Sequence, residues 1–207
     1  MKASKHLPKR GAVRVGPNPS VDGFGHGGER RSPLLPASIR AGMGNDLHRL
    51  VRGRKLILGG VRIPFEKGPA GHSDGDALAH AISDALLGAA ALGDIGRRFP
   101  DTSPKWHGVS SLLFLRHVRK LLQQAGYAIV NVDATVGLER PRLSPHIPRM
   151  QEKLARALGL KSGQVSVKAK TGEGLDAVGR GEAVRADAVA LIVVGASGAR
   201  PRAESVS

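Results

Sequence analysis

Segments with helical spacing alternate with segments of strand length between residues 39 and 194, and this alternation constrains the fold more than any other feature. Within residues 76–91, Leu78, Ile82 and Leu86 recur at helical spacing and would share one helix face. Two more helices are predicted over residues 110–124 and 144–158. Strands are predicted over residues 38–48, 55–63, 127–136, 165–170 and 186–194. Interleaved helices and strands imply a layered α/β or α+β domain.

Capping and turn residues mark the ends of these elements. We expect Ser73 or Asp74 to cap the first helix, Gly126 to close the second and Gly159 to end the third. Gly53 lies between the first two strands, which favours a hairpin that pairs residues 38–48 with residues 55–63.

The two ends of the chain differ from this central part. Residues 1–38 hold six Gly and five Pro and have no apolar periodicity. We therefore expect a basic, disordered arm over residues 1–38, one domain over residues 39–194 and a small, polar, disordered tail over residues 195–207. Three interpretations of the arm stay open: a start without a role, a tail that seeks phosphate, or a targeting peptide. Gly and Pro disfavour the apolar or amphipathic helix that a targeting peptide needs.

Composition excludes several classes of protein. The absence of cysteine excludes disulfides and thiolate metal sites, so a metal ion would need His, Asp or Glu ligands. No stretch reaches the roughly 18 apolar residues of a membrane-spanning helix, and we expect a soluble, cytoplasmic protein. The net charge of +15 is compatible with nucleic acid, but only 3% of the residues are aromatic, which supplies little stacking for single strands.

Asp46, His48 and His80 form a candidate metal site. Asp46 and His48 lie two residues apart on a predicted strand, so both side chains leave the same face of the sheet. His80 lies in mid-helix, where an imidazole has mediocre helix propensity and needs a polar partner. One carboxylate and two imidazoles would leave a fourth position of a zinc ion open, which is typical of catalytic sites. Without further context, ordinary polar roles explain such a triple better.

Motifs around these residues narrow the interpretation. The run Gly71-His72-Ser73-Asp74-Gly75-Asp76 leads into the helix that bears His80, and residues 89–96 lead out of it toward Phe99-Pro100-Asp101-Thr102. Each alone is typical of a capping box or a turn. Further motifs are Leu58-Gly59-Gly60-Val61-Arg62-Ile63-Pro64, Glu139-Arg140-Pro141-Arg142, Pro145-His146-Ile147-Pro148, Lys168-Ala169-Lys170-Thr171-Gly172-Glu173 and Gly179-Arg180-Gly181-Glu182. In this order they resemble the 2-C-methyl-D-erythritol 2,4-cyclodiphosphate synthases of the non-mevalonate isoprenoid pathway.

The resemblance implies an α+β fold: a mixed sheet with helices on one face, and three such sheets packed around a homotrimer axis with active sites between subunits. It also implies cyclisation of 4-diphosphocytidyl-2-C-methyl-D-erythritol 2-phosphate, whose 2-phosphate attacks the β-phosphorus and expels CMP. Because the nucleophile belongs to the substrate, the protein has to position a polyanion and neutralise its charge.

The resemblance further assigns roles to residues of this chain. Asp46, His48 and His80 would hold Zn²⁺, and Glu173 would bind a second ion, Mg²⁺ or Mn²⁺, together with the substrate diphosphate. His72 and Thr171 would stabilise the transition state. The implied substrate contacts are Asp46, Leu47, His48, His72 and Ser73; the methylerythritol loop Asp94, Ile95, Gly96, Phe99, Pro100, Asp101, Thr102 and Ser103; the cytidine segment Leu138, Glu139, Arg140, Pro141, Arg142, Leu143 and Ser144; the diphosphate cradle Lys170, Thr171, Gly172 and Glu173 of an adjacent subunit; and Ala177 and Arg180.

Three positions near the substrate depart from the family pattern. An acid is common where Ser103 stands, Lys where Arg142 stands, and a Thr-rich run where Lys170-Thr171-Gly172 stands. Arg in place of Lys keeps the charge, and Lys170 adds a cation beside a polyphosphate, so both changes are compatible with activity.

The residues expected at the trimer axis also depart from the pattern. Asn45 and Ala177 stand where aromatic residues are common, although Arg180 and Asp187 remain. The binding of isoprenoid diphosphates at the axis is therefore left open.

Two other classes of function compete with the synthase. A nucleic-acid-binding module would use the same positive charge, but no helix-turn-helix, zinc-finger or RNP pattern is present, and the expected substrate is itself a polyanion. A non-catalytic relative would keep the trimer as a scaffold, but all three candidate zinc ligands and Glu173 are present. The synthase is the favoured interpretation.

Overall fold

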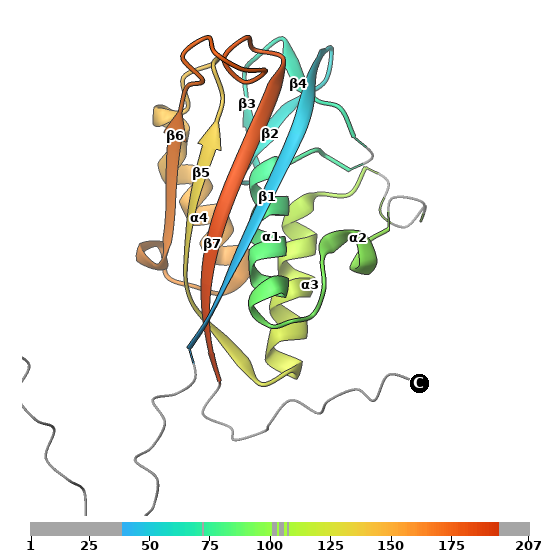
Figure 1. Cartoon of the computed structure of the whole chain (residues 1–207), viewed down its shortest axis with the longest axis vertical. Coiled ribbons are helices and arrows are strands. Elements are labelled where there is room, and N and C mark those ends of the chain that lie inside the picture. The colour runs from blue at the N-terminus through green and yellow to red at the C-terminus, as the bar shows by residue number, and fades with distance from the viewer. Residues whose placement is uncertain (1–38, 72, 101–102, 104–105, 107, 195–207) are drawn as a thin grey trace, which may run out of the picture. The chain divides into compact units, whose positions relative to one another are not determined.

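The computed structural model of the chain describes residues 39–71, 73–100, 103, 106 and 108–194. These residues form a five-stranded sheet with the strand order β4-β1-β7-β5-β6 (Figure 1). The strands are β1 (Ile39–Arg52), β4 (Lys67–Pro69), β5 (Tyr127–Gly137), β6 (Val165–Lys170) and β7 (Ala183–Val194). Only β5 and β6 run parallel, and the other neighbours are antiparallel, so the sheet is mixed.

Helices cover one face of this sheet (Figure 1). The long ones are α1 (Ala77–Ala89), α3 (Ser111–Gln124) and α4 (Ile147–Leu158), and the short ones are α2 (Ile95–Arg98) and the 3-10 turns η2 (Ser144–His146) and η3 (Ser162–Gln164). The predicted α+β class, a mixed sheet with helices on one face, is confirmed. Within the described residues, no helix is both long and apolar enough to cross a membrane.

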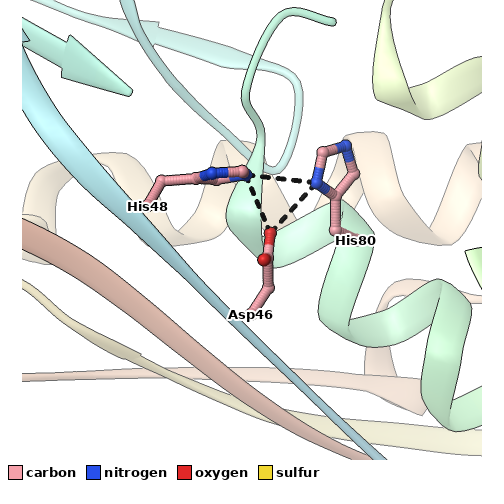
Figure 2. Close-up of side chains that lie close together, drawn as sticks. All are labelled: Asp46, His48 and His80. Atoms are coloured by element: carbon pink, nitrogen blue, oxygen red, sulfur yellow. Dashed lines mark hydrogen bonds and ion pairs between the residues drawn. The ribbon is translucent and has the colours of Figure 1, made fainter. Parts of the chain in front are cut away.

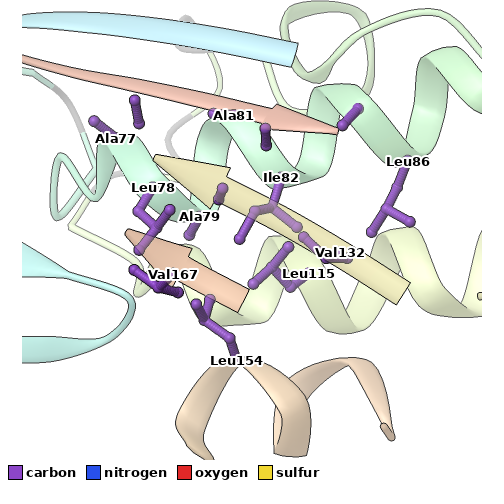
Figure 3. Packing of buried hydrophobic residues seen from close by; sticks show 14 of the residues in the cluster. Ala77, Leu78, Ala79, Ala81, Ile82, Leu86, Leu115, Val132, Leu154 and Val167 are labelled. Atoms are coloured by element: carbon purple, nitrogen blue, oxygen red, sulfur yellow. The ribbon is translucent and has the colours of Figure 1, made fainter. Parts of the chain in front are cut away.

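The core lies between the helices and the sheet. Leu78 and Ile82 of α1 pack among Leu115 of α3, Val132 of β5 and Leu154 of α4 (Figure 3). These side chains are almost wholly buried, and each contributes about 1.5–3 kcal/mol of hydrophobic stabilisation. The apolar residues that recur at helical spacing within residues 76–91 therefore face the core.

The predicted hairpin between the first two strands is wrong. β1 pairs with β7 and with β4, and it continues to Arg52 rather than ending at residue 48. Residues 55–63 instead form β2 (Leu56–Leu58) and β3 (Val61–Ile63), a two-stranded sheet of their own. The turn between them consists of Gly59 and Gly60, with φ angles of 56° and 70°. Two consecutive positive φ angles suit a tight hairpin turn, which glycine adopts without strain.

The predicted ends of the helices are partly correct. α1 is capped by Asp76 rather than by Ser73 or Asp74, because the Asp76 carboxylate accepts from the Ala79 amide at 3.1 Å. Gly126, with φ 79°, and Gly159, with φ 69°, follow α3 and α4 as predicted. The third helix begins with the 3-10 turn η2, and α2 was not predicted because four residues show no apolar period.

Candidate active site

Three potential metal ligands meet where β1 faces α1. Asp46 and His48 leave the same face of β1, and His80 projects toward them from the first turn of α1 rather than from the predicted mid-helix position, because the helix begins only at Ala77 (Figure 2). Asp46 Oδ2 lies 3.0 Å from both His48 Nε2 and His80 Nδ1, and the two nitrogens are 3.4 Å apart. The three side chains predicted from the strand and helix spacing are thus brought together and could hold a metal ion.

A glycine allows the helix to approach the strand closely enough for this contact. A Cβ atom added to Gly44 would lie 2.5 Å from the amide nitrogen of Ala85 and would also overlap with the carbonyl oxygen of Ala81. Only a residue without a side chain lets β1 and α1 pack this tightly. The close approach places His80 opposite Asp46.

Electrostatics keep the carboxylate of this site ionised. Burial by itself raises the pKa of Asp46, but hydrogen bonds from His48 and His80 outweigh it and hold the pKa well below its usual range. Burial lowers the pKa of His80, but the Asp46 carboxylate outweighs this effect and raises it. Asp76 behaves oppositely to Asp46: burial and the Asp74 carboxylate raise its pKa to about 6, against three backbone N–H donors. Asp46 therefore carries a negative charge at neutral pH, as a metal-binding carboxylate must.

The triad lies in a cavity of about 340 Å³. Several residues predicted to bind the substrate line this cavity together with the triad. Gly71, Trp106 and Phe114 also line it and were not predicted. The lining residues are Asp46, His48, Gly71, Ser73, His80, Ile95, Gly96, Phe99, Trp106 and Phe114. Polar ligands on one side and an apolar wall on the other make the cavity fit to bind a small molecule with both kinds of group.

The apolar wall is an aromatic cluster. Phe99 stacks on Phe114 with ring centroids 4.6 Å apart, and Trp106 meets Phe99 edge-on at 5.0 Å. Phe114 also stacks against His80 at 5.9 Å. Trp106 is the chain's only tryptophan. A lone tryptophan just after the Phe99-Pro100 motif, in a chain so poor in aromatic residues, was the signal that could have pointed to this wall.

The predicted methylerythritol loop lies at the rim of the cavity. Asp94 caps α2 by accepting from the Arg97 amide at 2.9 Å. The Ile95 amide donates to Asp84 Oδ1 at 2.8 Å, which ties the loop to α1. Asp94 and Pro100 are exposed, and Ser103 is half-buried. His72, Asp101 and Thr102, which were predicted for the site, lie outside the described residues.

The segments predicted to bind cytidine and diphosphate lie beside each other but apart from the cavity lining. The Leu138 amide donates to the Lys170 carbonyl at 2.9 Å, and the Gly172 amide donates to Glu139 Oε2 at 3.0 Å. Thr171 Oγ1 donates to Glu173 Oε1, and Glu173 has a φ of 50°. Arg140, Arg142 and Ser144 are exposed, Pro141 is half-buried, and Leu138 and Leu143 are buried. Among the described residues of the chain, no hydrogen bond or ion pair joins this region to the triad.

The remaining predicted residues lie near the uncovered face of the sheet or beyond its end. Leu47 points away from the triad and is 61% exposed, so only its backbone can face the cavity. Asn45 is the cross-strand partner of Asp187. Arg180 pairs with Glu182 at 3.2 Å in the turn that follows Ala177.

Comparisons with known proteins agree with this arrangement. The model of the YgbB family matches residues 39–193. A protein of Chloroherpeton thalassium named 2-C-methyl-D-erythritol 2,4-cyclodiphosphate synthase is 58% identical over 154 residues, which cover 74% of this chain and 98% of that protein. A synthase of the same name from Desulfosudis oleivorans is 57% identical over 155 residues, covering 75% and 92%.

Solved structures are also similar. A 2C-methyl-D-erythritol-2,4-cyclodiphosphate synthase described as the CDP-bound form has a TM-score of 0.69 at 42% identity, covering 74% of this chain and 99% of that one. The bifunctional IspDF of Campylobacter jejuni has a TM-score of 0.73 at 36% identity, covering 76% and 42%. The chain therefore belongs to the YgbB family. The resemblance inferred from the motifs is confirmed, and the chain is an enzyme of the 2-C-methyl-D-erythritol 2,4-cyclodiphosphate synthase type in isoprenoid biosynthesis.

Proposed function

We propose that the chain cyclises 4-diphosphocytidyl-2-C-methyl-D-erythritol 2-phosphate to 2-C-methyl-D-erythritol 2,4-cyclodiphosphate and releases CMP. The observation that carries this proposal is the triad of Asp46, His48 and His80 in a cavity with an aromatic wall, in a chain of this family. A polyanionic substrate with a small carbon skeleton needs these two kinds of surface side by side.

The triad suits a zinc ion. Tetrahedral zinc with ligand bonds of about 2.0–2.1 Å holds its ligand atoms about 3.3 Å apart, and the three atoms here are 3.0–3.4 Å apart. A carboxylate and two imidazoles are also ligands that zinc prefers, and they leave a fourth position for the substrate. When bound, zinc would supply a Lewis acid for a phosphate oxygen. Asp46, His48 and His80 would hold it.

The rest of the cavity would orient the substrate. Ile95, Phe99, Trp106 and Phe114 offer apolar surface to the methylerythritol carbons, and Asp94 at the rim can accept hydrogen bonds from its hydroxyl groups. Such positioning brings the 2-phosphate toward the β-phosphorus, and alignment of this kind supplies a large part of the catalytic effect in phosphoryl transfer.

The segment from Lys170 to Glu173 would complete the site. Glu173 is an exposed carboxylate, and one carboxylate plus substrate phosphates is ordinary coordination for Mg²⁺ or Mn²⁺. We assign transition-state stabilisation to Thr171 and His72, which can donate hydrogen bonds to phosphoryl oxygens. Lys170 and Arg142 add positive charge near the diphosphate. The CDP in the related synthase supports a cytidine nucleotide as the ligand of residues 138–144.

A homotrimer with sites between subunits is part of the proposal. The sheet face opposite the helices exposes Met43 to 67%, Leu47 to 61% and Val189 to 47%. Met43 and Val189 are cross-strand partners and form an apolar strip on this face, while Leu47 lies beyond the polar pair of Asn45 and Asp187. Apolar strips of this kind are typical of surfaces that another protein covers. Three such faces packed around an axis would bring the Lys170–Glu173 segment of one subunit to the triad of the next.

The disordered arm and tail and the cytoplasmic location stay predictions. The test of the proposed reaction is CMP release from the named substrate, with zinc and Mg²⁺ present. We expect the wild-type protein to turn over the substrate and Asp46→Asn to lose this activity. Glu152→Gln, which removes an exposed carboxylate of α4, should retain most of it. A correctly folded, zinc-loaded wild-type protein that released no CMP would contradict the proposal.

A further inference from the structure

The far side of the His80 ring is held by a residue that no motif had singled out. His80 Nε2, the nitrogen turned away from Asp46, lies 2.9 Å from Ser111 Oγ. Ser111 is wholly buried and begins α3. The contact therefore joins the helix that bears a proposed metal ligand to the start of the next long helix.

Ser111 is held in turn by Asp74. Ser111 Oγ lies 2.5 Å from Asp74 Oδ1, and the Ser111 amide donates to Asp74 Oδ2 at 3.1 Å. Oδ1 also accepts from the Asp76 amide at 3.3 Å. Both oxygens of Asp74 thus accept from N–H groups, as an ionised carboxylate does, and such a group has no hydrogen to donate.

The direction of these hydrogen bonds follows from counting hydrogens. A serine hydroxyl has one hydrogen, and Ser111 gives it to Asp74 because Asp74 can only accept. Ser111 Oγ must then accept from His80, which requires the hydrogen of the imidazole to be on Nε2. The lone pair of a neutral imidazole is then on Nδ1, the atom that faces Asp46 and His48.

We propose that Asp74 and Ser111 are positioning residues that hold His80 in the tautomer and ring orientation that present Nδ1 to a metal ion. This inference rests on the proposed metal centre. Partners behind a metal-binding histidine commonly change metal affinity by about 10–100-fold. The stacking of Phe114 on the same ring restricts its rotation as well.

Ser73 provides a matched comparison. Its hydroxyl lies 3.3 Å from the same His80 Nε2, at a longer distance than Ser111, and it already accepts from the Gly75 amide at 3.2 Å. If the Asp74–Ser111 pair fixes the tautomer, Ser111→Ala changes zinc binding and Ser73→Ala changes it little.

The experiment measures the zinc affinity of the purified full-length protein by competition with a chelator. We expect Ser111→Ala to weaken zinc binding about 10–100-fold, Ser111→Thr to restore most of it, and Ser73→Ala to stay within about threefold. In nitrogen-15 NMR of the zinc-loaded protein, the wild type should show a slowly exchanging His80 Nε2–H proton. Ser111→Ala should lose that proton signal through faster exchange with water.

A double variant tests whether Asp74 acts on zinc binding through Ser111. Asp74→Ala should weaken zinc binding, and the Asp74→Ala, Ser111→Ala double variant should bind no more weakly than Ser111→Ala, because Asp74 acts through the serine. Unchanged zinc affinity and an unchanged Nε2–H signal in a folded Ser111→Ala protein would overturn this inference alone, even if its thermal stability fell. A wild-type protein that binds no zinc would overturn the proposed metal centre and the inference together.

Discussion

The triad and the Lys170–Glu173 segment are expected to serve one active site, yet a single subunit builds them differently. Asp46, His48 and His80 contact one another inside a cavity, and buried partners hold His80 from behind. Glu173 is exposed, and its carboxylate accepts a hydrogen bond from Thr171, two residues away. Among the described residues, no hydrogen bond or ion pair joins the two regions. The fold of one chain therefore preassembles the half of the proposed site that would hold a metal ion, and it leaves the half that would bind the diphosphate exposed.

The largest effect is expected in the preassembled half. His80→Ala leaves one carboxylate and one imidazole, which cannot hold zinc tightly, so zinc should be lost and turnover should fall by about 10³-fold or more. Metal analysis of the purified protein and the CMP assay measure both. His117→Ala, which removes an exposed histidine of α3, is the control for zinc content alone and should keep about one zinc per subunit. Equal zinc content in wild type and His80→Ala would remove His80 from the site.

Mixing subunits tests whether the two halves come from different chains. His48→Ala and Glu173→Ala are each expected to be inactive alone. In trimers co-expressed from both, about a quarter of the sites should combine an intact triad with an intact Glu173 from the neighbouring subunit. CMP release by purified hybrids measures this. Verified hybrids without activity would mean that each subunit completes its own site.

Loss of the exposed Glu173 carboxylate should lower turnover less than loss of His80 does. Glu173→Gln should keep zinc and fold but bind Mg²⁺ more weakly, and turnover should fall about 10²-fold, which corresponds to about 3 kcal/mol of transition-state stabilisation. Raised Mg²⁺ should restore part of the rate. The Mg²⁺ dependence of CMP release decides: identical curves for wild type and variant would show that Glu173 does not bind the ion.

A change in the close packing of β1 against α1 should lower the free energy of unfolding. Gly44→Ala forces β1 away from α1, because the added carbon overlaps with the α1 backbone, and we expect a loss of about 3 kcal/mol together with weaker zinc binding. Gly163→Ala is the matched control, since a Cβ there meets nothing within 4 Å. Denaturant unfolding measures both. A Gly44→Ala protein as stable as the Gly163→Ala protein would contradict the close-packing argument.

The smallest effect is expected outside both halves. Removal of residues 1–37 should change kcat/KM for CMP release by less than about twofold, because that segment has no periodicity that could form a core. Steady-state kinetics of the truncated protein provide the measurement. A large fall in kcat/KM of a correctly folded trimer would indicate that the arm reaches the substrate.

Much of the candidate site could be predicted from local patterns. The two-residue spacing of Asp46 and His48 determines that both leave one face of β1, and helical spacing determines that His80 shares a face of α1 with Asp84, four residues on. The motif order around them sufficed to identify the family. These properties are local, because the direction of a side chain follows from the period of its own strand or helix.

The tertiary structure decided which distant segments meet. Gly59 and Gly60 turn residues 56–63 into a separate hairpin, so β1 pairs with β7 and β4 instead. The approach of α3 brings Phe114 and Ser111 to His80, which no spacing within residues 110–124 could indicate. Strand pairing and helix approach depend on how the whole core packs, and a buried hydroxyl finds its partner only after that packing is complete. The sequence by itself thus determined the candidate metal ligands and the family, while the strand order, the aromatic wall and the partners behind His80 were decided by the packed fold.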